Sequence, residues 1–241
     1  MRASNFTALT APGEYTNLPK PRAILFDWDN SLVETWPSII AALNATLAEM
    51  GHPIWSESEA KLKIRASLRD AFPAMFGTRW EIARDIYYRE FTRTHLESLV
   101  AKPNADELLR YLSQNNGAKT ARDPLFLGVV SNKQGKYLRA ECTALNWDGY
   151  FQALVGANDA VRDKPDPAVI DHVLHGSAIL PGPDVWLVGD TAMDMHCAWA
   201  AGCTPILVGT PNDGEDFSQY PPAWHCVDLE SLLQGCRAMS K

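Results

Sequence analysis

Several features that would assign this 241-residue chain to a special class are missing. No apolar run approaches the roughly 20 residues that a membrane-spanning helix needs, and residues 1–21 lack the continuous apolar core of a signal peptide. Basic residues number 22 against 29 acidic ones, so the net charge of -7 gives no electrostatic footprint for nucleic acid or an anionic membrane. We therefore expect a small-molecule partner, and neither nucleic acid nor membrane.

Cysteine is scarce and shows no paired spacing. The five cysteines are odd in number and include no C-x-x-C pair. This pattern argues against a disulfide framework or a zinc site and favours free thiols in a reducing compartment. Together with the lack of a signal-peptide pattern, it predicts a cytoplasmic protein.

Short apolar, β-branched runs alternate with helix-like segments along the chain. Such runs suit strands that helices cover on both faces, as in a doubly wound parallel sheet. The runs are 23–26, 125–130, 153–155, 185–188 and 205–208, with 223–227 as a weaker sixth. The predicted fold class is α/β, and the carboxyl ends of the strands should line one edge, where ligands of open α/β sheets bind.

The segment between the first two runs is far longer than a crossover needs. Residues 37–51 (PSIIAALNATLAEMG) and 79–99 carry apolar side chains at helical spacing, with Gly51 as the expected stop of the first helix. We therefore predict an α/β core formed by residues 1–33 and 103–241, with a helical cap domain, residues 34–102, inserted after the first strand.

The first apolar run ends in two aspartates, in the stretch LFDWDNS (25–31). Asp27 and Asp29 are two residues apart, so an extended backbone directs both side chains to one side and Trp28 to the other. Carboxylates this close repel, so both stay ionised only beside a cation; otherwise one takes up a proton. The pair suits a Mg²⁺ site or a nucleophile beside a general acid, with a solvated loop as the ordinary alternative.

Polar residues also follow the second and third runs. Ser131 and Asn132 come directly after 125–130, where a hydroxyl and the N–H groups of a helix N-terminus would form an anion site. Alternatively, one of them is simply the N-cap of the next helix. Lys164 precedes Pro165 and a helix, and its compact charge suits phosphate or nearby carboxylates, although a lone lysine is more often a surface residue.

A second acidic pair follows the fourth run, in GDTAMD (189–194). Asp194 lies one helical turn beyond Asp190, so both can face the same way. Such a pair at a strand end can hold Mg²⁺ directly and through water. The competing interpretation makes Asp190 the helix N-cap and Asp194 an exposed helical residue.

These motifs occur in a recognisable order: D-x-D, S-N, K-P and G-D-x-x-x-D, with a helical insert after the first. The order resembles the haloacid dehalogenase-like hydrolase superfamily, and most of all its phosphoglycolate phosphatase-type branch with a helical cap. The resemblance spans residues 22 to about 210 and rests on four motifs together. It implies a Mg²⁺-dependent phosphatase that hydrolyses a small phosphorylated metabolite through an aspartyl-phosphate.

The resemblance also implies roles for the acidic residues. Asp27 would be the nucleophile that attacks phosphorus and a metal ligand. Asp29 would protonate the leaving oxygen, activate the hydrolytic water and ligate Mg²⁺ through its backbone carbonyl. Asp190 would be a direct metal ligand, and Asp194 would support the metal through water or Lys164.

The resemblance implies other residues for phosphate binding and for substrate choice. Ser131 and Lys164 would bind the phosphoryl group, with the Asn132 backbone nearby. Residues 63–77 are similar to the substrate-specificity loop of the cap, where Arg65 and Arg69 could meet an anionic substrate group; a solvated helix face is the alternative for both arginines.

One departure from the family pattern is the turn after Asp29, where the family usually has Gly-Thr and this chain has Asn30 and Ser31. Asparagine is among the few non-glycine residues that tolerate a left-handed backbone, so the turn can survive. Ser31 keeps the hydroxyl of threonine.

Two other functions remain open at this point. A sugar-phosphate mutase of the same fold would need Asp27 and Asp29 too but would retain the phosphoryl group, so release of phosphate separates the two activities. A catalytically silent domain that binds a phospho-ligand or a protein should have lost catalytic residues, whereas Asp27, Asp29, Lys164 and Asp190 are all present.

Overall fold

The computed structural model describes residues 14–64, 68–114, 124–211 and 214–240. The chain divides into two compact units, and the main divisions fall between Leu32 and Val33 and between Val100 and Ala101. The first unit contains all four sequence motifs, and the second contains the helical insert. That the second unit acts as a cap remains a prediction.

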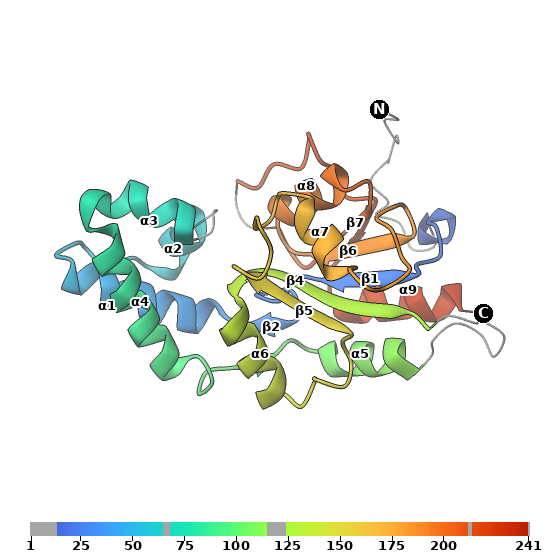
Figure 1. Ribbon diagram of the computed structural model, residues 1–241, viewed down its shortest axis with the longest axis horizontal. Coiled ribbons are helices and arrows are strands. Elements are labelled where there is room, and N and C mark those ends of the chain that lie inside the picture. The colour runs from blue at the N-terminus through green and yellow to red at the C-terminus, as the bar shows by residue number, and fades with distance from the viewer. Residues whose placement is uncertain (1–13, 65–67, 115–123, 212–213, 241) are drawn as a thin grey trace. The chain divides into compact units, whose positions relative to one another are not determined.

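The first unit is built on a six-stranded, all-parallel sheet, which confirms the predicted fold class (Figure 1). Its strand order is β5-β4-β1-β6-β7-β8. The strands are β1 (Ala23–Phe26), β4 (Phe126–Gln134), β5 (Ala153–Ala157), β6 (Val185–Gly189), β7 (Thr204–Val208) and β8 (Trp224–Cys226). All six predicted apolar runs form strands, and β1, β6 and β7 are buried at every residue, as expected for strands that helices cover on both faces.

Helices cover both faces of this sheet. They are α5 (Ala105–Gln114), α6 (Gly135–Ala144), α7 (Ala168–Val173), α8 (Ala192–Ala200) and α9 (Leu229–Met239), with a short 3-10 helix η1 (Glu14–Asn17) before β1. Figure 1 shows α5, α6 and α9 on one face and α7 and α8 on the other. Leu25 and Leu187 point to the second face, where they form a buried core with Ile170 of α7 and Ala198 of α8. Two-sided burial of this kind makes the central strands rigid supports for groups at their ends.

The second unit is helical. It contains α1 (Trp36–Glu49), α2 (Glu57–Lys63), α3 (Leu68–Phe76), η2 (Gly77–Arg79) and α4 (Trp80–Thr94), and β2 (Val33–Glu34) pairs with β3 (Val100–Ala101). Gly51 has φ 78°, a backbone angle that ends α1 as predicted. Phe72 of α3 packs edge-on against Tyr87 of α4, which stacks on Phe91. The aromatic stripe of the insert is therefore its own core.

One local expectation and one competing interpretation were wrong. Ser131 and Asn132 do not begin a helix: β4 continues through Gln134, because its pairing with β5 resumes at Gln134 after a register shift. Asp190 is not the N-cap of α8 either. The cap is Thr191, and Asp194 completes its capping box and is buried rather than exposed.

No helix in the described part of the chain is both long and apolar enough to cross a membrane.

Candidate active site

The candidate site lies at the carboxyl edge of the sheet, where β1 and β6 end beside the longer strand β4. In the parallel register, Phe26 of β1 pairs with Val129 of β4 and with Val188 of β6. Asp27 therefore leaves β1 between the ends of its two neighbours, close to Ser131 and Asp190. The register thus brings together motifs that are far apart in the sequence.

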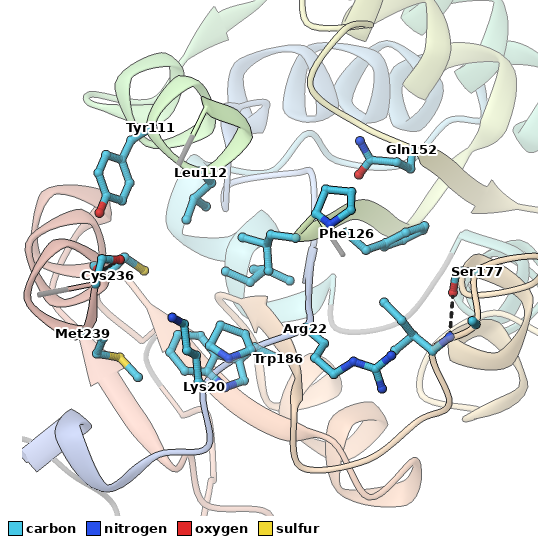
Figure 2. Close-up of a pocket in the computed structure, with 17 residues that line it drawn as sticks. Lys20, Arg22, Tyr111, Leu112, Phe126, Gln152, Ser177, Trp186, Cys236 and Met239 are labelled. Atoms are coloured by element: carbon cyan, nitrogen blue, oxygen red, sulfur yellow. Dashed lines mark hydrogen bonds between the residues drawn. The ribbon is translucent and has the colours of Figure 1, made fainter. Parts of the chain in front are cut away.

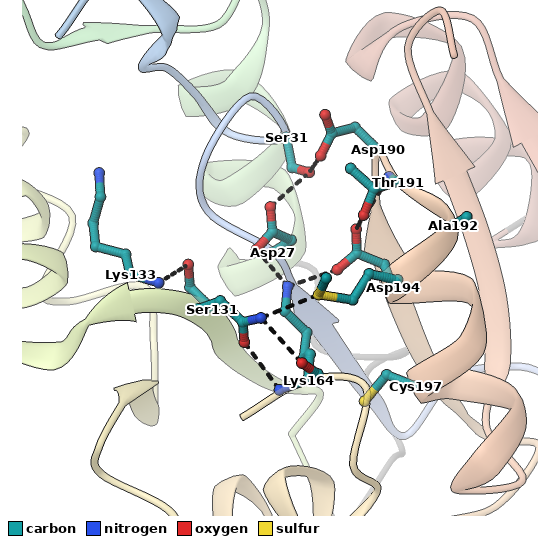
Figure 3. A network of polar contacts seen from close by, with 12 residues as sticks. Asp27, Ser31, Ser131, Lys133, Lys164, Asp190, Thr191, Ala192, Asp194 and Cys197 are labelled. Carbon is teal, nitrogen blue, oxygen red and sulfur yellow. Dashed lines mark hydrogen bonds and ion pairs between the residues drawn. The ribbon is translucent and has the colours of Figure 1, made fainter. Parts of the chain in front are cut away.

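Lys164 links two of the aspartates. Its Nζ lies 2.6 Å from Oδ1 of Asp27 and 2.6 Å from Oδ1 of Asp194 (Figure 3). The lysine side chain is 4% exposed, so the surface-residue interpretation is wrong. Burial opposes the ammonium charge, but the two carboxylates outweigh it and hold the pKa of Lys164 above its ordinary value. Lys164 is therefore a fixed cation inside the site.

Three carboxyl groups crowd around this cation. Ligand atoms of Asp27, Asp190 and Asp194 lie within 4.8 Å of one another. Burial, together with the charges of Asp194 and Asp29, raises the pKa of Asp27 to about 7, although Lys164 opposes the shift. Burial and the charges of Asp27 and Asp194 raise the pKa of Asp190 well above its ordinary value. One lysine does not balance this concentration of negative charge.

Ser31 connects two members of the cluster. Its hydroxyl contacts Oδ2 of Asp27 at 3.3 Å and Oδ1 of Asp190 at 3.0 Å, and one hydroxyl proton can serve only one of these carboxyl groups at a time. The turn that delivers Ser31 depends on Asn30, which has φ 62°, the left-handed conformation expected from the sequence. The Asn-Ser variant of the turn therefore keeps its geometry and its hydroxyl.

The donor set of this cluster fits Mg²⁺. It offers only oxygen atoms and is largely buried, and burial together with the neighbouring carboxylate charges raises the pKa values of Asp27 and Asp190. Asp27 and Asp190 are the side chains best able to hold the ion. Asp194 has less freedom, because Lys164 contacts its Oδ1 and the backbone N–H and hydroxyl of Thr191 both donate to its Oδ2.

Gly189 makes room for Asp194. A Cβ added at this glycine would collide with the carboxyl group of Asp194. The Gly-Asp pair that follows β6 thus has a steric reason: only glycine lets the α8 carboxylate reach back under the strand end.

Asn132 acts through Lys164. Its side-chain amide donates to the Lys164 carbonyl at 3.1 Å and accepts from the Lys164 N–H at 2.9 Å. The amide is therefore engaged in holding the loop of Lys164, and contact with a phosphate would have to come from the Asn132 backbone. Ser131, which is 3% exposed, accepts from the N–H of Lys133 through its hydroxyl.

Asp29 lies apart from the metal-ligand cluster. Its Oδ1 forms an ion pair with Nζ of Lys133 at 2.6 Å. Asp29 is still close enough for its charge to raise the pKa of Asp27. The two aspartates of the D-x-D motif thus have different cations, Lys164 for Asp27 and Lys133 for Asp29.

Comparison with known proteins identifies the family of the chain. The model of the haloacid dehalogenase-like hydrolase family matches residues 24–208, which is more than half of the chain. The chain belongs to this family.

Relatives and solved structures of this hydrolase family cover most of its length. A phosphoglycolate phosphatase of Pseudomonas savastanoi is 28% identical over 91% of this chain and 81% of its own length, and one of Yersinia pestis is 26% identical over 88% and 91%. A haloacid dehalogenase-like hydrolase of Streptococcus pneumoniae has the same fold, with a TM-score of 0.75 at 20% identity over 88% of this chain and 96% of its own. The resemblance inferred from the four motifs is confirmed.

Sequence reasoning missed Lys133 and Glu141 of this hydrolase. Both are almost fully buried, and Lys133 contacts Asp29 and Glu141 together. The signal was present for the lysine, since Lys133 lies two residues beyond Ser131 in an extended segment and so shares its side of the strand. Nothing local indicated Glu141, which is a helical residue of α6.

The cap arginines cannot be placed. Arg65 lies outside the described residues, and so does the side chain of Arg69, whose backbone belongs to α3. Their contact with substrate stays a prediction.

A separate pocket of about 580 Å³ lies at the opposite edge of the sheet, beside the amino ends of three strands (Figure 2). Ile24, Phe126 and Trp186 form part of its mainly apolar lining, and Lys20 and Arg22 also border it. None of the described residues that the sequence predicts for the site lines this pocket.

Proposed function

We propose that this protein is a Mg²⁺-dependent phosphatase that hydrolyses a small phosphate monoester through an aspartyl-phosphate formed on Asp27. The observation that carries the proposal is the position of Asp27: a buried carboxyl group at the end of the central strand, held by Lys164 and adjacent to a second acidic group, Asp190. The names of the relatives support phosphoglycolate as the first substrate to test.

The residues divide the work as follows. An oxygen of Asp27 attacks phosphorus, and the bond from phosphorus to the leaving oxygen breaks as the new bond forms. Lys164 and Ser131 bind the oxygens of the transferring group, and Asn132 holds the loop of Lys164. Bound Mg²⁺ would supply the positive charge that the carboxylates and the phosphoryl oxygens need.

Asp29 handles protons in both halves of the reaction. It gives a proton to the leaving oxygen in the first half, and in the second it takes one from the water that hydrolyses the aspartyl-phosphate. The helical unit, residues 33–100, is proposed to act as a cap that excludes water and selects the substrate.

The central test is Asp27→Asn. Wild-type protein with Mg²⁺ should release inorganic phosphate from p-nitrophenyl phosphate and from phosphoglycolate, and EDTA should abolish the release. Asp27→Asn should lower kcat by at least about a thousandfold, because the amide is no nucleophile, while circular dichroism shows an intact fold.

Asp184→Asn is the matched control. Asp184 pairs with Arg22 at the opposite edge of the sheet, so the same chemical change there should leave turnover intact. Unchanged turnover in Asp27→Asn would rule out the nucleophile assignment. Conversion of a sugar phosphate to its isomer without phosphate release would favour a mutase.

A further inference from the structure

Asp29 is linked to three other side chains, Lys133, Glu141 and Trp28, in a closed ring of contacts. The proposed chemistry gives a role to Asp29 but none to the other three. Lys133 Nζ lies 2.6 Å from Oδ1 of Asp29 and 2.6 Å from Oε2 of Glu141. The indole N–H of Trp28 donates to the same Oε2 at 2.7 Å. The peptide bond between Trp28 and Asp29 closes the ring.

Every member of the ring except Asp29 is almost fully buried. The side chains of Lys133 and Glu141 are 4% and 1% exposed. Trp28 is fully buried and packs edge-on against Trp147 and Phe151. Lysine and glutamate are rarely buried so completely unless they are paired, because desolvation of each charge is costly. The pair thus presents an ammonium group to Asp29 from a fixed position between β4 and α6.

The ammonium group of Lys133 contacts only one of the two carboxyl oxygens of Asp29. Oδ1 is buried and contacts Lys133, whereas the Asp29 side chain as a whole keeps 22% exposure. The contact of Oδ1 with Lys133 is an ion pair without hydrogen-bond geometry, and within the described residues no hydrogen bond or ion pair involves Oδ2. Of the two oxygens, Oδ2 is therefore the one available to a substrate.

We propose that Lys133, held by Glu141, is a positioning residue that fixes the carboxyl group of Asp29 with Oδ2 toward the leaving oxygen of the substrate. The proposal rests on the phosphatase function proposed above. In that reaction the bond from phosphorus to the leaving oxygen breaks, and the proton of Asp29 passes to that oxygen. A carboxyl group free to rotate would place its proton correctly only part of the time.

A purely structural role is the competing explanation, since the Lys133–Glu141 pair also joins β4 to α6. The two explanations differ in their dependence on the leaving group. An alkoxide needs a proton to depart, whereas dinitrophenolate departs without one. A misplaced Asp29 therefore slows cleavage of an alkyl phosphate selectively, but a general disturbance of the site slows both cleavages alike.

The experiment compares kcat/KM for phosphoglycolate and for 2,4-dinitrophenyl phosphate, because this constant reports the steps up to departure of the leaving group. The variants are Lys133→Met, Glu141→Gln, and the double variant that removes both buried charges together. Arg139→Met is the matched control: Arg139 also pairs across from α6, with Asp159, but at an exposed place.

Both single variants and the double variant should lower kcat/KM for phosphoglycolate at least about tenfold more than for the dinitrophenyl ester. Arg139→Met should leave the ratio of the two constants unchanged. If Lys133→Met does not fold, Glu141→Gln and the double variant decide. An unchanged ratio in folded variants overturns the positioning role alone, whereas a wild-type protein that cleaves neither ester overturns the proposed function itself.

Discussion

Replacing Lys164 by methionine should destabilise the metal-free protein by up to about 4 kcal/mol at pH 7, and by much less at pH 5. The lysine Nζ contacts Asp27 and Asp194 at 2.6 Å each, and all three groups are buried. Methionine has a similar length and no charge, so the substitution removes the cation and keeps most of the packing.

Proton uptake sets the upper limit of this effect. A buried carboxylate that loses its cation can bind a proton instead, and at pH 7 this costs about 4 kcal/mol for a group with an ordinary pKa of about 3.9. Asp27 adds little to the cost, because burial already raises its pKa to about 7. The second carboxyl group that loses its contact with the cation is that of Asp194, whose side chain is 1% exposed.

The dependence on pH follows from linkage. In the variant, the folded state binds the extra proton more tightly than the unfolded chain, so stability rises as pH falls from 7 toward 4. At pH 5 the same protonation costs only about 1.5 kcal/mol.

Urea unfolding in EDTA at both pH values measures the difference in unfolding free energy from wild type. Lys136→Met, at an exposed lysine of α6, makes the same change of residue and should stay within about 0.5–1 kcal/mol. An equal deficit for Lys164→Met at pH 7 and pH 5 would refute the electrostatic reasoning and point to lost packing.

Three further predictions concern the site and the thiols. Gly189→Ala should destabilise the fold by about 1–3 kcal/mol and lower Mg²⁺ affinity, since its Cβ collides with Asp194. Gly149→Ala, where a Cβ meets open space, is the control. Equal Mg²⁺ affinities of the two variants in calorimetric titration would contradict the steric argument. Mg²⁺ affinity should rise with pH by up to about tenfold per pH unit below about pH 7, because the proton on Asp27, whose pKa burial raises to about 7, must leave before the ion binds. A calorimetric affinity independent of pH would contradict this coupling of proton release to metal binding. The five cysteines should react with a thiol reagent at pH 8 only after unfolding, since all are buried and burial raises the pKa of Cys142 to about 12; rapid labelling of the native protein would show otherwise.

Much of the fold could be predicted from local pattern. The first apolar run, residues 23–26, coincides with β1, and Gly51 ends α1 where expected. The prediction failed at Ser131, since periodicity cannot show that β4 keeps pairing with β5 beyond its apolar residues. Local pattern could not decide between a buried and an exposed Asp194, because the space for its carboxylate depends on the missing side chain of Gly189, on another element.

The sequence by itself determined the order of strands and helices and the chemical types at the strand ends, because those follow from hydrophobic period and from the turn chemistry of residues such as Asn30. Only the tertiary structure decided which cation each aspartate has. Lys164, in the segment between β5 and α7, contacts Asp27 across a separation of 137 residues, and Lys133 of β4 contacts Asp29, which follows β1. Such pairing is set by the sheet register and by the desolvation cost of a buried charge that has no partner of opposite sign. Neither is encoded in a local stretch of chain.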